Sequence, residues 1–141
     1  MNKKLEYWHA NLVANMNKLG LLIIGESNIG KSSFSHYLVT NYGFSLVADD
    51  LVVVEKIETI WLGSLYNRAY QGKLHIHDKG FCIVKQTQAS AYITHVVYLY
   101  EKQQLETYIK RANLLACDVI DIDVYKKSWQ MCYQELQNLL G

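Results

Sequence analysis

The pattern of apolar and polar positions along the chain predicts many short strands. Apolar runs rich in β-branched and aromatic side chains are typical of strands buried in a sheet. Runs of this kind occupy residues 21–24, 44–48, 51–57, 59–62, 74–77, 81–84, 91–100 and 119–124. The stretch 5–15 is ambiguous and includes a candidate strand at Leu12 and Val13, whereas residues 64–73 show no period and are interpreted as a surface connection.

Helical spacing is clear in only two segments. Within 32–40, an i, i+3, i+4 apolar stripe predicts a helix, and Gly43 follows where a C-cap residue belongs. A second helix is predicted from Ser128 on the stripe Trp129, Cys132, Tyr133, Leu136, Leu139 and Leu140. Residues 105–111 have only a weak helical pattern. Because the helix at 32–40 is the one evident β-α-β crossover, the pattern predicts an α/β fold with a mixed sheet and few helices.

Composition and charge narrow the class of protein. The chain has 141 residues, which suits a single domain over 1–141, and its net charge of +1 gives no electrostatic footprint for nucleic acid. The apolar runs are too short to cross a bilayer, and no signal-peptide pattern opens the chain. The three cysteines lack zinc-ligand spacing. Reduced thiols in a cytoplasmic protein, with no nucleic-acid or membrane partner, are therefore expected.

The strongest chemical signal is the segment 25–32, which has the pattern G-x-x-x-x-G-K-[ST] between a predicted strand and a predicted helix. Glycines let backbone N–H groups approach phosphate oxygens, and the helix N-terminus adds partial positive charge. Lys31 is expected to reach the β- and γ-phosphates and Ser32 to hold Mg²⁺. A simple glycine-containing turn is the alternative, but the strand and helix around it favour a phosphate loop. The predicted nucleotide-binding residues are Gly25, Glu26, Ser27, Asn28, Ile29, Gly30, Lys31 and Ser32.

Two adjacent acids, Asp49 and Asp50, follow the apolar run 44–48. In phosphate-loop enzymes a carboxylate in this position holds Mg²⁺ directly or through water, and a second one can accept a proton from a hydroxyl nucleophile. Neighbouring strand side chains point to opposite faces, so the two acids need not share one role. A pair of solvated turn aspartates is the alternative. The helix that leads from the phosphate loop into this strand favours a functional role.

Taken together, His9, the segment 25–32 and the segment 43–50 resemble the catalytic domain of the bacterial HPr serine kinase/phosphorylase family, also called HPr kinase/phosphatase. That family has a histidine before the loop, then G-x-S-G-x-G-K-S, then R-G-H-x-L-V-A-D-D. Residues 46–50 match the end of the last motif residue for residue, while Phe44 stands where the family has histidine. The resemblance is to short members with only the C-terminal catalytic domain. It implies a phosphate-loop kinase fold related to the nucleotide-binding domain of phosphoenolpyruvate carboxykinase.

The resemblance also implies an activity. Family members transfer the γ-phosphoryl group of ATP to a serine of HPr, the phosphocarrier protein of the sugar phosphotransferase system, and so regulate carbohydrate metabolism. They reverse the reaction by phosphorolysis, which yields pyrophosphate. Carried over by position, His9, Lys31 and Asp50 are the catalytic residues, with Asp50 as the acid and base, and Asp49 joins Ser32 at the metal. The implied cofactors are ATP and Mg²⁺, and the implied assembly is a homo-oligomer, a hexamer in the family.

Two histidines depart from the family pattern. In the segment 73–81, His75 replaces a metal-binding glutamate of the family and His77 replaces an arginine. Imidazole is a poor ligand for Mg²⁺ and a better one for Mn²⁺ or Zn²⁺. At i and i+2 of a strand the two side chains point the same way, which fits either a metal site that includes His75 or two exposed histidines. Arg68 and Arg111 are unaligned candidates for the family's catalytic arginine.

Three functions remain open on these residues. The first is an HPr kinase/phosphorylase, which requires His9, Lys31, Ser32, Asp49 and Asp50 together. The second is a regulatory module that binds nucleotide but has lost catalysis, as the two histidine replacements suggest. The third is a small-molecule kinase on the same fold.

Overall fold

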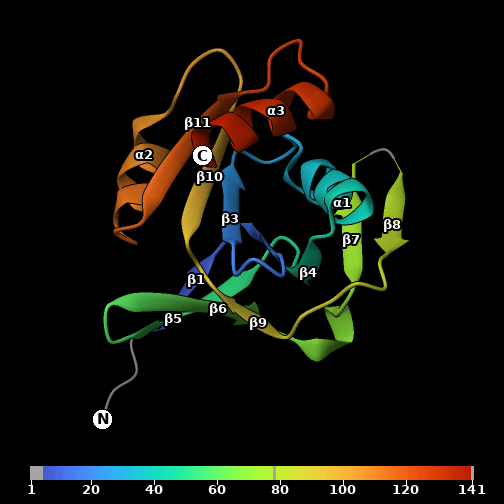
Figure 1. Cartoon of the computed structure of the whole chain (residues 1–141), viewed down its shortest axis with the longest axis vertical. Coiled ribbons are helices and arrows are strands. Elements are labelled where there is room, and N and C mark those ends of the chain that lie inside the picture. Colours follow the sequence, from blue (N-terminus) through green and yellow to red (C-terminus); the bar gives the residue numbers. More distant parts are fainter. Residues whose placement is uncertain (1–4, 78, 141) are drawn as a thin grey trace.

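A five-stranded mixed sheet carries the predicted phosphate loop at the end of its central strand. The computed structural model of the chain describes residues 5–77 and 79–140 and has an α/β fold (Figure 1). The sheet has the strand order β11-β10-β3-β2-β4. Its strands are β2 (Asn11–Ala14), β3 (Gly20–Gly25), β4 (Ser45–Ala48), β10 (His95–Tyr100) and β11 (Asp118–Asp123).

Most strands of this sheet point in one direction. β3, β10 and β11 pair in parallel, whereas β2 runs antiparallel to both of its neighbours, β3 and β4. β4 consequently runs parallel to β3. The carboxyl ends of parallel strands meet at one edge of a sheet, which is where α/β proteins bind ligands. The loop after β3 and the acidic pair after β4 therefore lie at the same edge.

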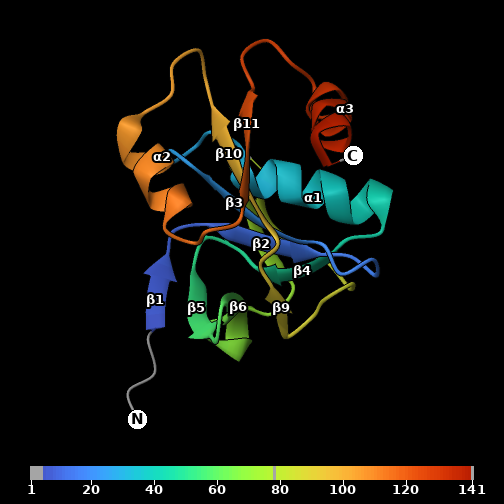
Figure 2. The same ribbon diagram turned by 60° about the vertical axis from the view of Figure 1, so that its left-hand side comes forward.

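Three helices cover the two faces of the sheet (Figure 2). α1 (Lys31–Tyr42) and α3 (Trp129–Leu140) lie on one face, and α2 (Glu106–Asn113) lies on the other. β3 is buried on both faces, because Leu22 and Ile24 belong to the core beneath α2 while Leu21 and Ile23 belong to the core beneath α1 and α3. This double burial explains why the run 21–24 is continuously apolar.

Two smaller sheets flank the central one. An antiparallel sheet with the order β1-β5-β6-β9 contains β1 (Leu5–Trp8), β5 (Val52–Ile57), β6 (Ile60–Leu65) and β9 (Ser90–Tyr92). β7 (Lys73–Ile76) and β8 (Gly80–Ile83) form a hairpin beside α1 (Figure 1). The strands predicted at 74–77 and 81–84 are thus confirmed as a hairpin, and Asp78 between them lies outside the described residues. The predicted end of α1 is also confirmed, because Gly43 caps it with a φ of 72°.

The run 91–100, predicted as one strand, is two strands in different sheets. β9 pairs with β6, whereas β10 pairs with β3. The chain changes sheet at Thr94, whose backbone N–H donates to the Gly20 carbonyl at 2.9 Å and whose hydroxyl accepts from the Gly20 N–H at 3.0 Å. A side chain at Gly20 would overlap the Tyr92 carbonyl, so glycine permits this close approach.

Two further sequence interpretations are corrected by the structure. The weak pattern at 105–111 is the helix α2, which joins the parallel strands β10 and β11 and makes a second β-α-β crossover. The segment 64–73 is not wholly irregular, since β6 extends to Leu65 and a 3₁₀ helix, η1, spans Arg68–Tyr70. Within residues 5–77 and 79–140, no helix combines the length and the apolar character needed to cross a membrane.

Candidate functional site

The phosphate-loop segment curls between β3 and the N-terminus of α1 with backbone angles that favour glycine. Gly30, the N-cap of α1, has a φ of 114°. Asn28 has a φ of 68°. This left-handed conformation explains how asparagine can stand where the HPr kinase motif has glycine, because asparagine tolerates it better than most residues. The loop therefore keeps its curvature despite the replacement.

The Lys31 side chain folds back over the loop. Its Nζ donates to the carbonyls of Gly25 at 2.8 Å and Glu26 at 2.9 Å. Burial lowers the pKa of the Lys31 ammonium from its ordinary value, and the nearby charges of Asp50 and Asp49 partly oppose that shift. A half-buried cation held at the mouth of a loop of backbone N–H groups is suited to an anionic ligand.

A buried asparagine, Asn11 on β2, organises the polar groups beside the loop. Its side chain is fully buried, and Nδ2 lies 2.7 Å from Asp49 Oδ1 and 3.0 Å from Ser35 Oγ. The amide oxygen accepts the backbone N–H of Asp50 at 3.0 Å. Asn11 thus ties the acidic pair to both the central sheet and α1. Sequence reasoning missed it; the only signal was one polar residue in the apolar segment 10–14.

Asp49 joins three elements through its carboxylate. Oδ1 accepts a hydrogen bond from the Ser32 hydroxyl as well as from Asn11, and Oδ2 accepts the backbone N–H of His75 at 2.9 Å. The structure therefore brings the two predicted metal-binding oxygens, those of Ser32 and Asp49, into direct contact. Both are hard oxygen donors, the ligand type that Mg²⁺ prefers.

Asp50 has a different environment from its neighbour. It is exposed, with a left-handed φ of 68°, and it lines two adjacent cavities. The first, of about 480 Å³, contains the phosphate loop. The second, of about 410 Å³, is lined by largely apolar and aromatic residues that include Leu65, Tyr66 and Phe81. Asp50 can therefore meet both a bound phosphate and a second reactant.

His75 and His77 both line the phosphate-loop cavity. The His75 ring packs against Phe81 with its centroid 5.0 Å away, and its backbone N–H, as noted, bonds Asp49. In the described part of the chain, no group of three or more His, Cys, Asp or Glu residues is arranged to hold a metal ion. A divalent ion here would depend on Ser32, Asp49 and the ligand's own oxygens, with His75 as an optional addition.

Five predicted or candidate residues do not line the phosphate-loop cavity, and two of them, Gly25 and Glu26, belong to the loop itself. His9 lies in the bend between β1 and β2 and lines a separate cavity with Trp8 and Arg111. Arg111 stacks over the Trp8 ring at 4.1 Å and donates to the Tyr7 carbonyl at 2.9 Å. Arg68 lies in η1 and borders neither cavity that Asp50 lines. A catalytic role for His9 stays a prediction.

Comparisons with known proteins concern the family and the fold of the chain. A model of the HPr Serine kinase C-terminal domain matches residues 3–108, about three quarters of the chain. The chain belongs to this family. Among solved structures, the HPr(Ser) kinase/phosphatase from Coxiella burnetii superposes with a TM-score of 0.74 at 22% identity, covering 96% of each chain. A search of curated proteins finds no match. The expected fold class is thereby confirmed, and a kinase/phosphatase-type phosphotransferase is the activity that the family supports.

One further residue of the cavity was not predicted as part of the site. Trp129, the first residue of α3, lines the phosphate-loop cavity. The sequence placed it on an apolar stripe, and its ring does pack against Phe34 with centroids 5.3 Å apart. Its position beside Gly30 had no local sequence signal, because it follows from the pairing of β11 with β10.

Proposed function

We propose that the chain is a cytoplasmic, ATP-dependent serine kinase/phosphorylase that acts on the HPr phosphocarrier protein and so regulates carbohydrate metabolism. The observation that carries the proposal is the convergence of Lys31, Ser32 and Asp50 on one cavity at the carboxyl edge of the parallel strands. Positioning and charge neutralisation account for most of the catalysis in phosphoryl transfer, and these residues supply both.

The phosphate chain of ATP would lie in the loop, where backbone N–H groups of residues 25–32 surround it. Lys31 would exchange its two carbonyl partners for β- and γ-phosphate oxygens. Ser32 and Asp49 would hold Mg²⁺, which neutralises phosphate charge when bound. Asn11 keeps the Asp49 carboxylate directed at Ser32 throughout, since its amide already donates to that carboxylate.

Asp50 would act on the proton of the acceptor. The serine oxygen attacks the γ-phosphorus, and the bond between the γ-phosphorus and the oxygen that bridges it to the β-phosphorus breaks. ADP leaves, and the serine proton passes to Asp50. In the reverse direction an oxygen of inorganic phosphate attacks the phosphorus of phosphoserine, the serine oxygen leaves with the proton of Asp50, and pyrophosphate forms. The apolar cavity on the far side of Asp50 supports an acceptor carried on a protein segment.

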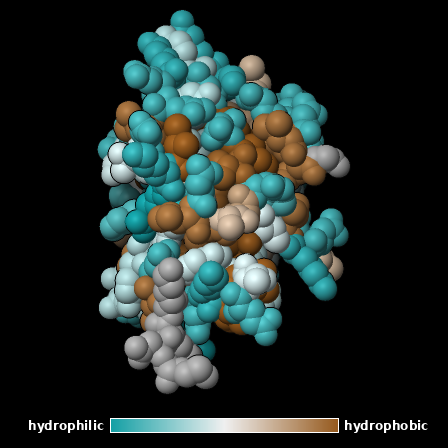
Figure 3. All heavy atoms as spheres, turned by 90° about the vertical axis from the view of Figure 1, so that its left-hand side faces the viewer, coloured by the Kyte–Doolittle hydropathy of each residue, from teal (hydrophilic) through white to brown (hydrophobic). Residues whose placement is uncertain are grey.

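A homo-oligomer, a hexamer by family resemblance, is part of the proposal. Apolar atoms gather at the surface of the face that carries α2 and β1 (Figure 3). Exposed apolar side chains of the chain include Leu5, Ile60, Leu105 and Leu114. Association through such a face would remove apolar surface from water.

A regulatory module that binds nucleotide without transferring phosphate is the second candidate, favoured by His75 in place of a carboxylate. Incubation with γ-labelled ATP, purified HPr and either Mg²⁺ or Mn²⁺ separates the two. The kinase proposal predicts label on a serine of HPr and its release as pyrophosphate when phosphate is added. Nucleotide binding with an unlabelled HPr would support the regulatory module, and label on a metabolite alone would point to a small-molecule kinase.

A further inference from the structure

Trp129 lies directly against the phosphate loop. A Cβ atom built on Gly30 would lie only 2.5 Å from Cη2 and 2.6 Å from Cζ2 of the Trp129 ring. The six-membered edge of the indole therefore touches the last glycine of the loop. The side chain is half-buried, with Phe34 behind it, and it lines the same cavity as the loop. Part of an aromatic ring is thus presented to any ligand that fills the cavity.

The sheet order fixes on which side of the loop this ring stands. The loop follows the central strand β3, the acidic pair follows β4 at one edge of the sheet, and Trp129 follows β11 at the opposite edge. All of these strands end at the same side of the sheet. The carboxylates and the aromatic ring consequently lie on opposite sides of the phosphate loop.

This arrangement fixes the orientation of a bound nucleotide relative to the sheet. Its terminal phosphate must lie toward Lys31 and Asp50, so the nucleoside must extend the other way. We propose that Trp129 stacks against the base of the bound nucleoside triphosphate and thereby selects a nucleotide over an inorganic polyphosphate. Aromatic rings stack on all bases, so this contact favours a nucleobase without choosing among the bases.

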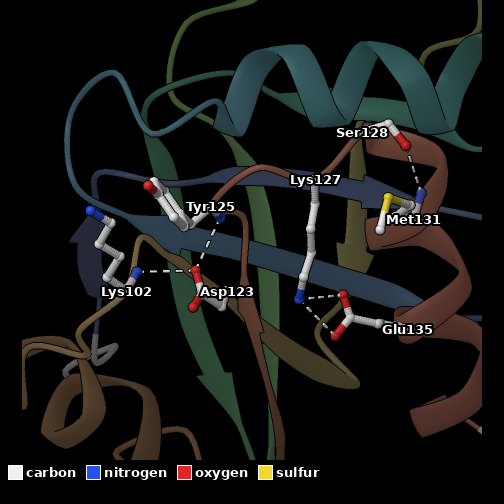
Figure 4. A network of polar contacts seen from close by, with 7 residues as sticks. All are labelled: Lys102, Asp123, Tyr125, Lys127, Ser128, Met131 and Glu135. Atoms are coloured by element: carbon white, nitrogen blue, oxygen red, sulfur yellow. Dashed lines mark hydrogen bonds and ion pairs between the residues drawn. The ribbon is translucent and has the colours of Figure 1, made fainter.

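A network of polar contacts holds the segment that carries Trp129 (Figure 4). Asp123 Oδ1 accepts the backbone N–H groups of Lys102 and Tyr125, each at 3.0 Å. Lys127 Nζ donates to the carboxylate of Glu135 at 2.9 Å. Fixing this connection before the ligand arrives reduces the ordering cost of binding.

The helix start is fixed in the same way. Ser128 caps α3, since its hydroxyl oxygen accepts the Met131 N–H at 3.2 Å (Figure 4). Trp129 is the next residue, so its backbone is set by the cap. The ring is therefore a preformed surface beside the loop.

Binding of ATP and of inorganic tripolyphosphate, each with Mg²⁺, tests the inference by calorimetry on the whole chain. Trp129→Leu keeps an apolar side chain without a ring, and Trp129→Phe keeps a ring. We expect Trp129→Leu to weaken ATP binding about tenfold or more. Tripolyphosphate binding is expected to be unchanged in both variants, and Trp129→Phe is expected to lose less ATP affinity than Trp129→Leu.

Tryptophan fluorescence supplies a second measurement. Trp8 and Trp61 both belong to the core on the α2 face, away from the loop, so Trp129 is the reporter in this site. ATP is expected to quench the emission of the wild type more than tripolyphosphate does, and this difference should vanish in Trp129→Phe. Trp8→Phe is the matched control and should keep the difference in quenching between ATP and tripolyphosphate.

The outcomes separate this inference from the proposed function on which it rests. If the wild type binds neither ligand, the phosphate site and the inference both fail. If the wild type binds both ligands and Trp129→Leu keeps its ATP affinity, or loses affinity for both ligands equally, the ring only packs against Phe34 and the inference alone is overturned.

Discussion

Nδ2 of Asn11 lies 2.7 Å from Oδ1 of Asp49, and the asparagine side chain that makes this hydrogen bond is completely buried. The same amide accepts the backbone N–H of Asp50 through its oxygen. A single residue of β2 thus sets the position of both acids at the end of β4. Because β2 pairs with both β3 and β4, it also links those acids to the strand that carries the phosphate loop.

Replacing Asn11 with alanine should weaken the fold and the site together. It leaves the Asp50 N–H and one oxygen of Asp49 without their buried partner, which costs about 1–3 kcal/mol in the free energy of unfolding. Chemical denaturation measures this cost. Asn113→Ala, at an exposed position on α2, is the matched control and should be near neutral. Equal stability of the two variants would contradict the central role given to Asn11.

Replacing Lys31 with alanine should abolish binding of Mg-ATP while leaving the fold intact. A ligand at 100 times its Kd raises the free energy of unfolding by about 2.7 kcal/mol, which corresponds to several degrees in Tm for a domain of this size. The wild type should show that shift and Lys31→Ala should not. Lys85→Ala, at an exposed position outside the cavity, should behave as the wild type does. If nucleotide still raised the Tm of Lys31→Ala, the loop would not be the nucleotide-binding site.

His75 is the residue through which metal preference can be changed. Its ring lines the phosphate-loop cavity and its backbone bonds Asp49, so glutamate at this position would add a carboxylate where oxygen ligands are needed. We expect His75→Glu to raise the ratio of the HPr phosphorylation rate with Mg²⁺ to the rate with Mn²⁺ by several-fold. His36→Glu, on α1 outside the cavity, should leave that ratio unchanged. An unaltered ratio in His75→Glu would show that the ring takes no part in metal choice.

The stability contributed by the connection between β11 and α3 should fall at low pH. Backbone N–H groups of Lys102 and Tyr125 lower the pKa of the Asp123 carboxyl below its ordinary value of 3.8. A depressed pKa in the folded state stabilises the protein above the unfolded pKa, and the contribution is lost as pH falls through the folded pKa. The difference in stability between the wild type and Asp123→Asn should therefore be constant at neutral pH and shrink below about pH 4.

Urea unfolding from pH 7 to pH 2.5 checks this expectation. Asp121→Asn, at an exposed position on the same strand, should show no such change in its difference from the wild type. A difference for Asp123→Asn that stays constant down to pH 2.5 would contradict the role assigned to its ionised carboxylate.

Some parts of this site could be predicted from short segments of the sequence, and others could not. The phosphate loop and the acids at 49–50 could be predicted because each is a short contiguous segment next to its strand. Asn11 could not, because its role depends on β2 lying between β3 and β4. Trp129 could not either, because it reaches Gly30 only through the parallel pairing of β11 with β10. Long-range pairing has no local signature in one sequence.

The fold shows the same division. β3 could be predicted because burial on both faces requires a continuous apolar run. The change of sheet at Thr94 could not, because the segments before and after it, within the run 91–100, are both apolar and β-branched. α2 was weakly signalled because Ala112 is its only fully buried residue, so its polar face dominates the pattern. His9 was expected to be catalytic; it lies in the bend between β1 and β2 and lines a cavity with Arg111, not the phosphate-loop cavity, so its role stays a prediction.

The central claim is that Asp50 transfers the proton in a phosphoryl transfer from ATP to HPr. The most direct test compares the wild type with Asp50→Asn for labelling of HPr at saturating Mg-ATP. We predict that Asp50→Asn keeps the nucleotide-induced rise in Tm but labels HPr at least about a hundredfold more slowly than the wild type. Labelling of HPr by Asp50→Asn at the wild-type rate, or no labelling by the wild type with either Mg²⁺ or Mn²⁺, would contradict the claim.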